Sequence, residues 1–230
     1  METPIFIQQE TLAELAIDFP GATAIFNKYN LDYCCGGKQT LEQACAERGL
    51  PYDKILQEVM NSRPEAQGHT LRFHEWSSAF ITDFIEQNYH RYVRNALPMI
   101  GELLTKVNAV HGVKHPGLTI LEKQFELLAD ELLAHMHKEE VVLFPAMRQN
   151  EQLSESQSAF PLAAPIAVML DDHQQAGALL KLIRSQTNEY SAPSDACPTF
   201  MLLYEKMKEF DMELINHIHL ENNILFKRFS

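Results

Sequence analysis

The fold of this chain is decided by a ten-residue pattern that occurs twice. The first copy reads His135-Met-His-Lys-Glu-Glu-Val-Val-Leu-Phe144, and the second reads His217-Ile-His-Leu-Glu-Asn-Asn-Ile-Leu-Phe226. Both copies keep the first histidine, a glutamate four residues later and the final Leu-Phe. On a helix, residues four apart lie ~40° apart around the axis and one turn apart along it, so each pair faces one target. Two such pairs meeting inside a helical bundle would provide ligands for one or two transition-metal ions.

The composition is that of a globular protein without nucleic-acid or membrane partners. Hydrophobic residues make up 46% of the chain and charged residues 22%, which is ordinary. A net charge of −12 disfavours binding to nucleic acid or anionic membranes. Neither a secretory signal nor a membrane-spanning apolar run is visible, and four cysteines are too few for a disulfide scaffold. We therefore expect a cytoplasmic protein.

A small helical domain is predicted for residues 1–66. Thr11 with Glu14, and Thr40 with Gln43, have the spacing of capping boxes, which open helices. Between these helices, the stretch Leu-Asp-Tyr-Cys-Cys-Gly-Gly-Lys at 31–38 predicts a tight loop. Its paired glycines allow backbone angles that other residues resist.

The remaining residues, 67–230, are predicted to form an all-α, up-down-up-down four-helix bundle. The stretch 63–70 contains Pro and Gly and has the character of a linker, so we place the domain boundary there. Strand signals are missing, and short links between long helices favour a bundle. Helices are expected over 75–110, 118–149, 162–188 and 197–229.

Three of these helices carry a core seam in which residues recur at steps of three and four. Each seam is apolar except for a histidine, and two seams add a glutamate. By contrast, His137 and His219 sit ~200° around the helix and point away from the seam. The seams are Leu118, Leu121, Phe125, Leu128, Leu132, His135, Glu139 and Val142; then Leu162, Ile166, Met169, His173, Ala176, Leu180 and Ile183; then Phe200, Leu203, Met207, Phe210, Leu214, His217, Glu221 and Ile224.

Six polar residues fall at one level of the predicted bundle. Counted from the shared end at ~1.5 Å per residue, they lie within about 10 Å of axial height. In the first helix His90 is preferred, because His111 would lie ~50 Å from that end and His74 precedes the bundle. The six residues are His90, His135, Glu139, His173, His217 and Glu221.

These residues leave more than one interpretation open. A single seam histidine is usually a hydrogen-bonded core residue, and the repeated pairs could be a buried polar network or a duplication kept for packing. Convergence of all six favours metal binding, because buried unpaired carboxylates are costly. Four imidazoles and two carboxylates exceed what a tetrahedral structural zinc needs. They suit two ions bridged by carboxylates, with iron the natural occupant of a mixed nitrogen and oxygen site.

Two parts of the chain resemble known families. The four-helix part resembles a haemerythrin-like domain, and the Asp-Tyr-Cys-Cys-Gly-Gly motif resembles the signature of the iron–sulfur cluster repair di-iron proteins (the RIC family). The resemblance implies that the six residues bind two non-haem iron ions, bridged by Glu139 and Glu221 and by an oxo or hydroxo group. Haemerythrins proper have more histidines and an aspartate one place after position 221. Many haemerythrin-like domains also have a proline where this chain has Lys227.

By this resemblance, we expect a protein that repairs iron–sulfur clusters damaged by oxidative or nitrosative stress, by donating iron. Its partners would be damaged iron–sulfur proteins or a cluster-assembly scaffold, and a homodimer is left open. We therefore expect an iron donor rather than a conventional enzyme. The alternatives are reduction of nitric oxide to nitrous oxide, and binding or sensing of dioxygen or nitric oxide. A plain iron store is disfavoured, because nothing indicates a cage-forming interface.

The adjacent thiols of Cys34 and Cys35 have two interpretations. A Gly-rich turn beside Lys38 could leave them exposed, lower their pKa and make them reactive toward iron, nitric oxide or another thiol. They could instead be small apolar residues packed under a loop. The resemblance favours reactive thiols, whereas Cys45 and Cys197 are expected to be structural.

Overall fold

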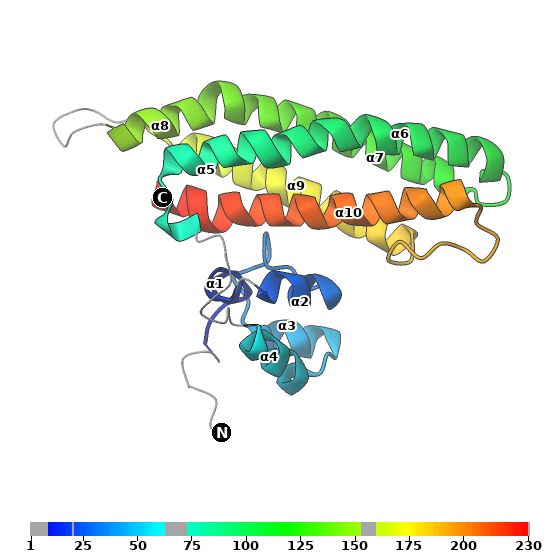
Figure 1. The fold of residues 1–230 in the computed structure, drawn as a ribbon, viewed down its shortest axis with the longest axis horizontal. Helices are drawn as coiled ribbons and strands as arrows, with labels where there is room; N and C mark the ends of the chain where they lie inside the picture. Colours follow the sequence, from blue (N-terminus) through cyan, green and yellow to red (C-terminus); the bar gives the residue numbers. More distant parts are fainter. Residues whose placement is uncertain (1–8, 20, 63–72, 153–159, 230) are drawn as a thin grey trace. The chain divides into compact units, whose positions relative to one another are not determined.

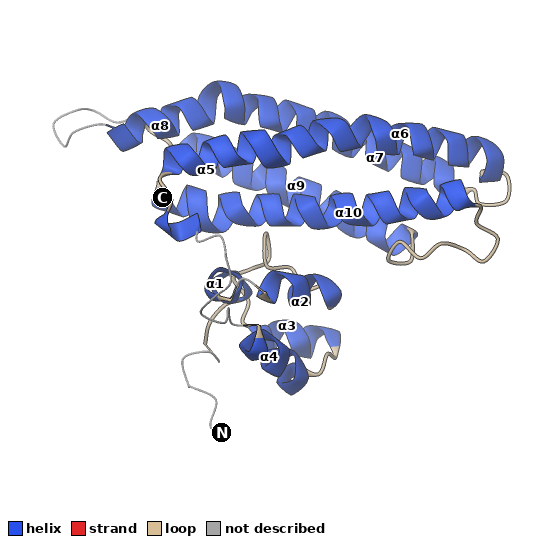
Figure 2. Cartoon of the chain, in the orientation of Figure 1, coloured by secondary structure: helices blue, strands red, loops and turns tan. Residues whose placement is uncertain are grey.

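The computed structural model describes residues 9–19, 21–62, 73–152 and 160–229. All regular structure in these ranges is helical, which confirms the predicted all-α class (Figure 2). The chain divides into two compact units. One takes in Met1–Trp76 and Ile218–Arg228, and the other takes in Ser77–His217 and Phe229–Ser230. The predicted domain boundary at 66/67 lies outside the described residues.

The N-terminal part of the first unit consists of short helices. The predicted capping boxes are both present: Thr11 caps α1, and Thr40 caps α3. Helix α3 ends at Arg48 and is capped by Gly49, whose φ of 63° is the left-handed conformation that glycine adopts readily. The helices are α1 (Leu12–Asp18), α2 (Ala22–Lys28), α3 (Leu41–Arg48) and α4 (Tyr52–Asn61).

The long helices form an up-down-up-down bundle (Figure 1). All of its described residues belong to the second unit except 218–228, at the end of the last rod, which belong to the first. Helix α7 packs against both α6 and α9. Pro98 lies inside α6, which continues past it to His111. The four rods are α5 (Ser78–Phe84), π-helix η2 (Ile85–His90) and α6 (Arg91–His111); α7 (Gly117–Lys138), π-helix η3 (Glu139–Leu143) and α8 (Phe144–Gln152); α9 (Ala163–Gln186); and α10 (Pro198–Leu220), continued by π-helix η4 (Glu221–Leu225) and the 3-10 turn η5 (Phe226–Arg228).

The predicted seams form the core of the bundle almost throughout. Every apolar seam residue of α7 before the first repeated motif is buried, as are those of α9 and α10. The prediction is wrong at Val142, which is 51% exposed, while Leu143, Phe144 and Met147 are buried. The cause is η3, because a π-helical turn holds about one residue more than an α-helical turn and delays the seam by one position.

The second copy of the motif shows the same shift. Ile224 was expected in the core but is only half-buried, whereas Leu225 and Phe226 are buried. The turn responsible is η4, which begins at Glu221 as η3 begins at Glu139. The final Leu-Phe of each motif is therefore the pair that returns the chain to the core after the π turn.

A buried ion pair joins α9 to α10. Asp211 is buried, and Arg184 contacts both of its carboxylate oxygens, with 2.7 Å between Nη2 and Oδ1. The Tyr190 hydroxyl donates to Asp211 Oδ2 at 2.8 Å.

Among the described residues, no helix is both long and apolar enough to cross a membrane.

Candidate metal centre

The structure buries all six residues that the sequence predicted as ligands. Each side chain belongs to a residue that is at most 4% exposed. Three of the six sit in π turns: His90 ends η2, Glu139 begins η3, and Glu221 begins η4. The other three lie in regular helix, in α7, α9 and α10, and are His135, His173 and His217.

These side chains gather into two groups of four. In each group, one nitrogen or oxygen from every residue lies within 4.8 Å of the others. Glu139 and Glu221 belong to both groups, while each histidine belongs to one. The groups are His90, Glu139, His217 and Glu221, and His135, Glu139, His173 and Glu221.

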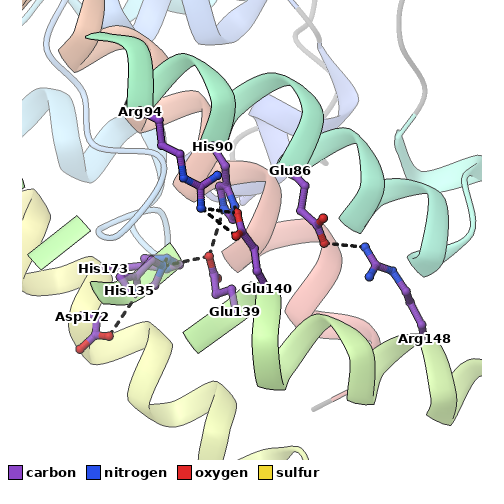
Figure 3. A network of polar contacts seen from close by, with 9 residues as sticks. All are labelled: Glu86, His90, Arg94, His135, Glu139, Glu140, Arg148, Asp172 and His173. Atoms are coloured by element: carbon purple, nitrogen blue, oxygen red, sulfur yellow. Dashed lines mark hydrogen bonds and ion pairs between the residues drawn. The ribbon is translucent and has the colours of Figure 1, made fainter. Parts of the chain in front are cut away.

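Glu139 lies between the two groups. Its Oε2 is 3.3 Å from His90 Nε2 and 3.3 Å from His135 Nε2 (Figure 3). The Nε2 atoms of His135 and His173 are 3.0 Å apart. Two nitrogens bound to one ion at about 2.1 Å and at right angles would be separated by ~3 Å. The spacing of these imidazoles therefore fits a shared ion.

The donor set also fits iron in its chemistry. Two carboxylates at zero exposure are costly unless positive charge compensates them, and a pair of divalent cations would do so. Imidazole nitrogen and carboxylate oxygen together form the mixed site that iron occupies readily.

Carboxylates also contact the outer nitrogens of two imidazoles. His90 Nδ1 donates to Glu140 Oε1 at 2.7 Å, and Arg94 Nη2 donates to both oxygens of that carboxylate at 2.7 Å. Burial alone would raise the pKa of Glu140, but the hydrogen bonds from Arg94 and His90 outweigh it and lower that pKa. The lowered pKa keeps Glu140 a carboxylate acceptor.

The second outer carboxylate is Asp172, which faces His135. His135 Nδ1 lies 3.2 Å from Asp172 Oδ2, and Lys138 Nζ donates to the same oxygen at 2.7 Å. Burial opposes ionisation of Asp172, but these two contacts outweigh it and lower its pKa. Sequence reasoning missed both outer carboxylates, because each occupies a position that reads as a solvent-facing charge.

Aromatic rings back two of the imidazoles. Tyr89 stacks on His217 with 5.1 Å between ring centroids and a 6° interplanar angle. Phe144 stacks on His90 at 5.8 Å and 15°. Tyr89 could not be predicted, because its place depends on the π turn η2, whereas Phe144 belongs to the repeated motif.

A cavity of about 130 Å³ reaches one side of the centre. It is large enough for a few water molecules. Its lining includes both imidazoles of one group and the ion pair outside them: His135, His173, Lys138 and Asp172.

Three further histidines among the described residues lie elsewhere. His137 is exposed, as its position opposite the seam predicts. His111 Nε2 is 3.3 Å from Cys197 Sγ, at the start of α10. His219 points away from the seam but is buried within the first unit, edge-to-face with Tyr33 at 5.1 Å. Burial lowers the pKa of His219 to about 4.

The loop with the adjacent cysteines is built around Asp32. Its Oδ1 accepts from the backbone N–H groups of Cys35 and Gly36 at 3.0 and 2.9 Å, and from the Cys34 thiol at 3.4 Å. The thiols lie 3.6 Å apart, and one donor atom from each of Asp32, Cys34 and Cys35 lies within 4.8 Å of the others, close enough to hold a metal ion together.

Two reasons given for this loop from the sequence are wrong. Cys34 is buried, and the neighbouring Cys35 thiol together with burial raises the pKa of Cys34 well above its ordinary value. The paired glycines are not needed for positive φ, which among the described glycines occurs only at Gly49. Gly37 is needed for space instead, because a Cβ there would lie 2.4 Å from the Tyr33 carbonyl oxygen.

Comparison with known proteins gives matches over both parts of the chain. Residues 8–63 match the ScdA_N family, described as a domain of unknown function (DUF542), and residues 85–229 match the hemerythrin HHE cation binding domain. A protein of Cronobacter sakazakii named iron-sulfur cluster repair protein YtfE is 41% identical over 225 residues, covering 96% of each chain. Proteins of the same name from Shigella boydii serotype 4 and Escherichia coli O81 are each 38% identical over 224 residues, with the same coverage.

Proposed function

Because this chain belongs to the family of the iron–sulfur cluster repair proteins, we propose that it restores clusters damaged by oxidative or nitrosative stress. The iron held in the buried centre is the material that it donates. One observation supports this function above all: two groups of buried donors share two carboxylates. The relatives named above all carry the repair name, and none of those names refers to nitric oxide reduction or dioxygen binding.

In this proposal, the six residues hold two iron ions. His90 and His217 serve one ion, and His135 and His173 serve the other. Glu139 and Glu221 would contact both ions, since only these two residues belong to both groups. Bound iron would supply a redox-active and exchangeable ion.

The protein's own side chains would make that iron available. The imidazoles sit on helices and are fixed by packing, whereas the glutamate carboxylates can move by rotating their side chains. Rotation of the Glu139 or Glu221 side chain would weaken the binding of one ion without unfolding the site. The cavity beside His135 and His173 gives small molecules access to that side of the centre.

The parts around the centre have proposed roles as well. We propose that residues 1–66 form one domain and residues 67–230 a second, the four-helix bundle. The thiols of Cys34 and Cys35 would act as the acceptor or docking group toward a damaged iron–sulfur protein. Support for this role comes from their 3.6 Å separation and their shared group with Asp32, not from exposure of Cys34.

Two measurements test the proposed function. Metal analysis with Mössbauer spectra of anaerobically purified protein should give two iron ions per chain in a coupled pair. The iron-loaded protein should then restore activity to a damaged cluster enzyme when a chelator removes free iron.

A double variant, Glu139→Gln with Glu221→Gln, should lose both iron and repair. The exposed Glu102→Gln serves as a matched control and should keep them. Full iron content without any repair would contradict the donor function, and one mononuclear ion per chain would contradict the bridged centre.

A further inference from the structure

The two copies of the repeated motif differ directly after their glutamates. The first copy has Glu140 after Glu139, and the second has Asn222 after Glu221. Asn222 donates to the Cys34 carbonyl at 3.3 Å, within the first unit. Glu140 instead reaches the outer nitrogen of His90, so the two adjacent glutamates of η3 contact opposite nitrogens of one imidazole. Of the two copies, only the first has a carboxylate after its glutamate that contacts the outer nitrogen of a proposed histidine ligand.

Arg94 fixes the position of this carboxylate. It lies one helical turn after His90 on α6, and its Nη2 is 2.7 Å from both Oε1 and Oε2 of Glu140. In Figure 3 dashed lines join the Glu140 carboxylate to both the guanidinium of Arg94 and the imidazole of His90. The Glu140 side chain is 24% exposed and His90 is fully buried, so the contact is largely shielded from water.

The chemistry of this contact determines which nitrogen of His90 can bind metal. An ionised carboxylate only accepts hydrogen bonds, so the N–H of the neutral imidazole sits on Nδ1. The lone pair then lies on Nε2, the atom that faces Glu139. A histidine that binds metal commonly donates its other N–H to a carboxylate, which fixes the ring and makes the ligand more basic.

We propose that Glu140, held by Arg94, is a positioning residue that sets the tautomer and orientation of His90 in the metal centre. This inference rests on the proposed function, since it concerns one of the proposed ligands. The arrangement at His135 supports it, because Asp172 and Lys138 there form the same series of cation, carboxylate and imidazole.

The chain contains a matched control for this network. Arg148 lies 2.6 Å from Glu86 and 2.8 Å from Asp83, and it also joins two rods of the bundle (Figure 3). The Glu86 side chain is 25% exposed, close to the 24% of Glu140. The contacts of Arg148 are with Thr82, Asp83 and Glu86, none of which is a proposed ligand. Loss of either network removes a similar ion pair, but only loss of the Arg94–Glu140 network should change how the metal is bound.

The test compares iron affinity and Mössbauer spectra of the full chain and its variants. Iron affinity is measured by anaerobic competition with a chelator series. Glu140→Ala should lower the affinity for one of the two ions by about 10–100-fold and change the spectrum of that ion. Glu140→Gln keeps an acceptor and should show a smaller change, as should Arg94→Lys, which keeps charge but not the two-oxygen contact. Arg148→Ala should leave affinity and spectrum unchanged.

Each other outcome has a distinct meaning. Unchanged affinity and spectrum in Glu140→Ala and Glu140→Gln would overturn the positioning role while leaving the proposed function intact. An equal change in Arg148→Ala would also overturn it, because the effect would then be general to ion pairs. A wild-type chain that holds no iron would overturn both proposals. Helical circular dichroism of each metal-free variant shows that it is folded.

Discussion

At the scale of single residues, the cysteines show how local contacts govern reactivity. Of the two interpretations of Cys34, exposed thiolate or residue packed under a loop, its burial beside a second thiol fits the packed one. Cys197 was expected to be structural, yet it lies half-buried at the start of α10 with His111 at 3.3 Å. Hydrogen bonds from the Phe200 backbone and from His111 lower the pKa of Cys197.

We predict that Cys197 is the thiol most readily alkylated at neutral pH. Its lowered pKa keeps the thiolate present at lower pH, so the rate with iodoacetamide should fall only below the midpoint of ~8.5 typical of free cysteine. His111→Gln should raise the midpoint, and the exposed His74→Gln should not. Burial raises the pKa of Cys45, which should react only on unfolding. A midpoint for Cys197 equal to that of free cysteine would contradict the prediction.

Two glycines give opposite predictions for the same substitution. Gly37→Ala should destabilise the chain by about 1–3 kcal/mol, because its Cβ would press on the Tyr33 carbonyl. Gly101→Ala should stabilise it by about 0.5–1 kcal/mol, since Gly101 lies inside α6 with no atom near a new Cβ. Urea unfolding measures both free energies, and the same sign for both would contradict the argument.

Sequence reasoning found the six candidate ligands because polar residues interrupt an otherwise apolar seam. The structure brings them together, and their binding to metal is proposed. Arg94 and Glu140 could not be found in this way, because on a helical wheel they resemble ordinary surface charges. Arg94 does carry one faint signal: it follows His90 by four residues, the spacing that separates histidine from glutamate in the repeated motif.

At the scale of elements, the π turns explain where the sequence pattern stopped predicting the core. Heptad counting assumes a regular helix, so it held through α7, α9 and α10 and failed after Glu139 and after Glu221. A π turn has no clear mark in residue types. The shift can be recognised only afterwards, from buried Leu143 and Leu225 where the pattern placed Val142 and Ile224 in the core.

Deletion of one residue tests this description of η3. Removing the exposed Val141 should convert the π turn to regular α-helix and leave the core positions on both sides in phase. The protein should fold but bind iron more weakly. Removing the exposed Leu133 from α7 should rotate every later residue by ~100° and prevent cooperative unfolding. If both deletions destabilise the chain equally in thermal melts, the extra-residue description is wrong.

The ion pair between α9 and α10 gives a second prediction at this scale. Asp211→Asn should cost about 3–5 kcal/mol, because it leaves the Arg184 guanidinium, 15% exposed, without its counter-charge. Lys206→Ala removes a surface pair with Glu209 and should cost less than about 1 kcal/mol. Chemical denaturation measures the difference, and comparable losses would show that burial of the pair is unimportant.

At the scale of the whole molecule, iron binding and folding should be linked. Iron that binds only the folded chain at 100 times its dissociation constant adds ~2.7 kcal/mol per ion. For a chain of this size, that corresponds to a rise in melting temperature of roughly 5–11 °C per ion. Calorimetry with and without ferrous iron measures it, and the double variant Glu139→Gln, Glu221→Gln should show no rise. An equal rise in that variant would place the stabilising iron elsewhere.

The division of the chain into units was the part least accessible from sequence. The prediction divided the chain into two consecutive segments, whereas contacts assign residues 218–228 to the same unit as the N-terminal helices. Contacts between residues so distant in sequence leave no periodic signal. Residue type gave no hint either, because His219 is buried whereas His137, at the same place in the first motif, is exposed.

That shared unit has a consequence for how the protein is made. Tyr33 and Cys34 find the partners of their carbonyls in Asn223 and Asn222, close to 190 residues later in the chain. During synthesis on the ribosome, the loop that carries Tyr33 and Cys34 can therefore form these two hydrogen bonds only after nearly the entire polypeptide has emerged. A nascent chain stalled before residue 218 would keep the hydrogen bonds of the cysteine loop to Asp32 but lack both asparagine contacts, so the loop would be complete only after the last helical turn is made.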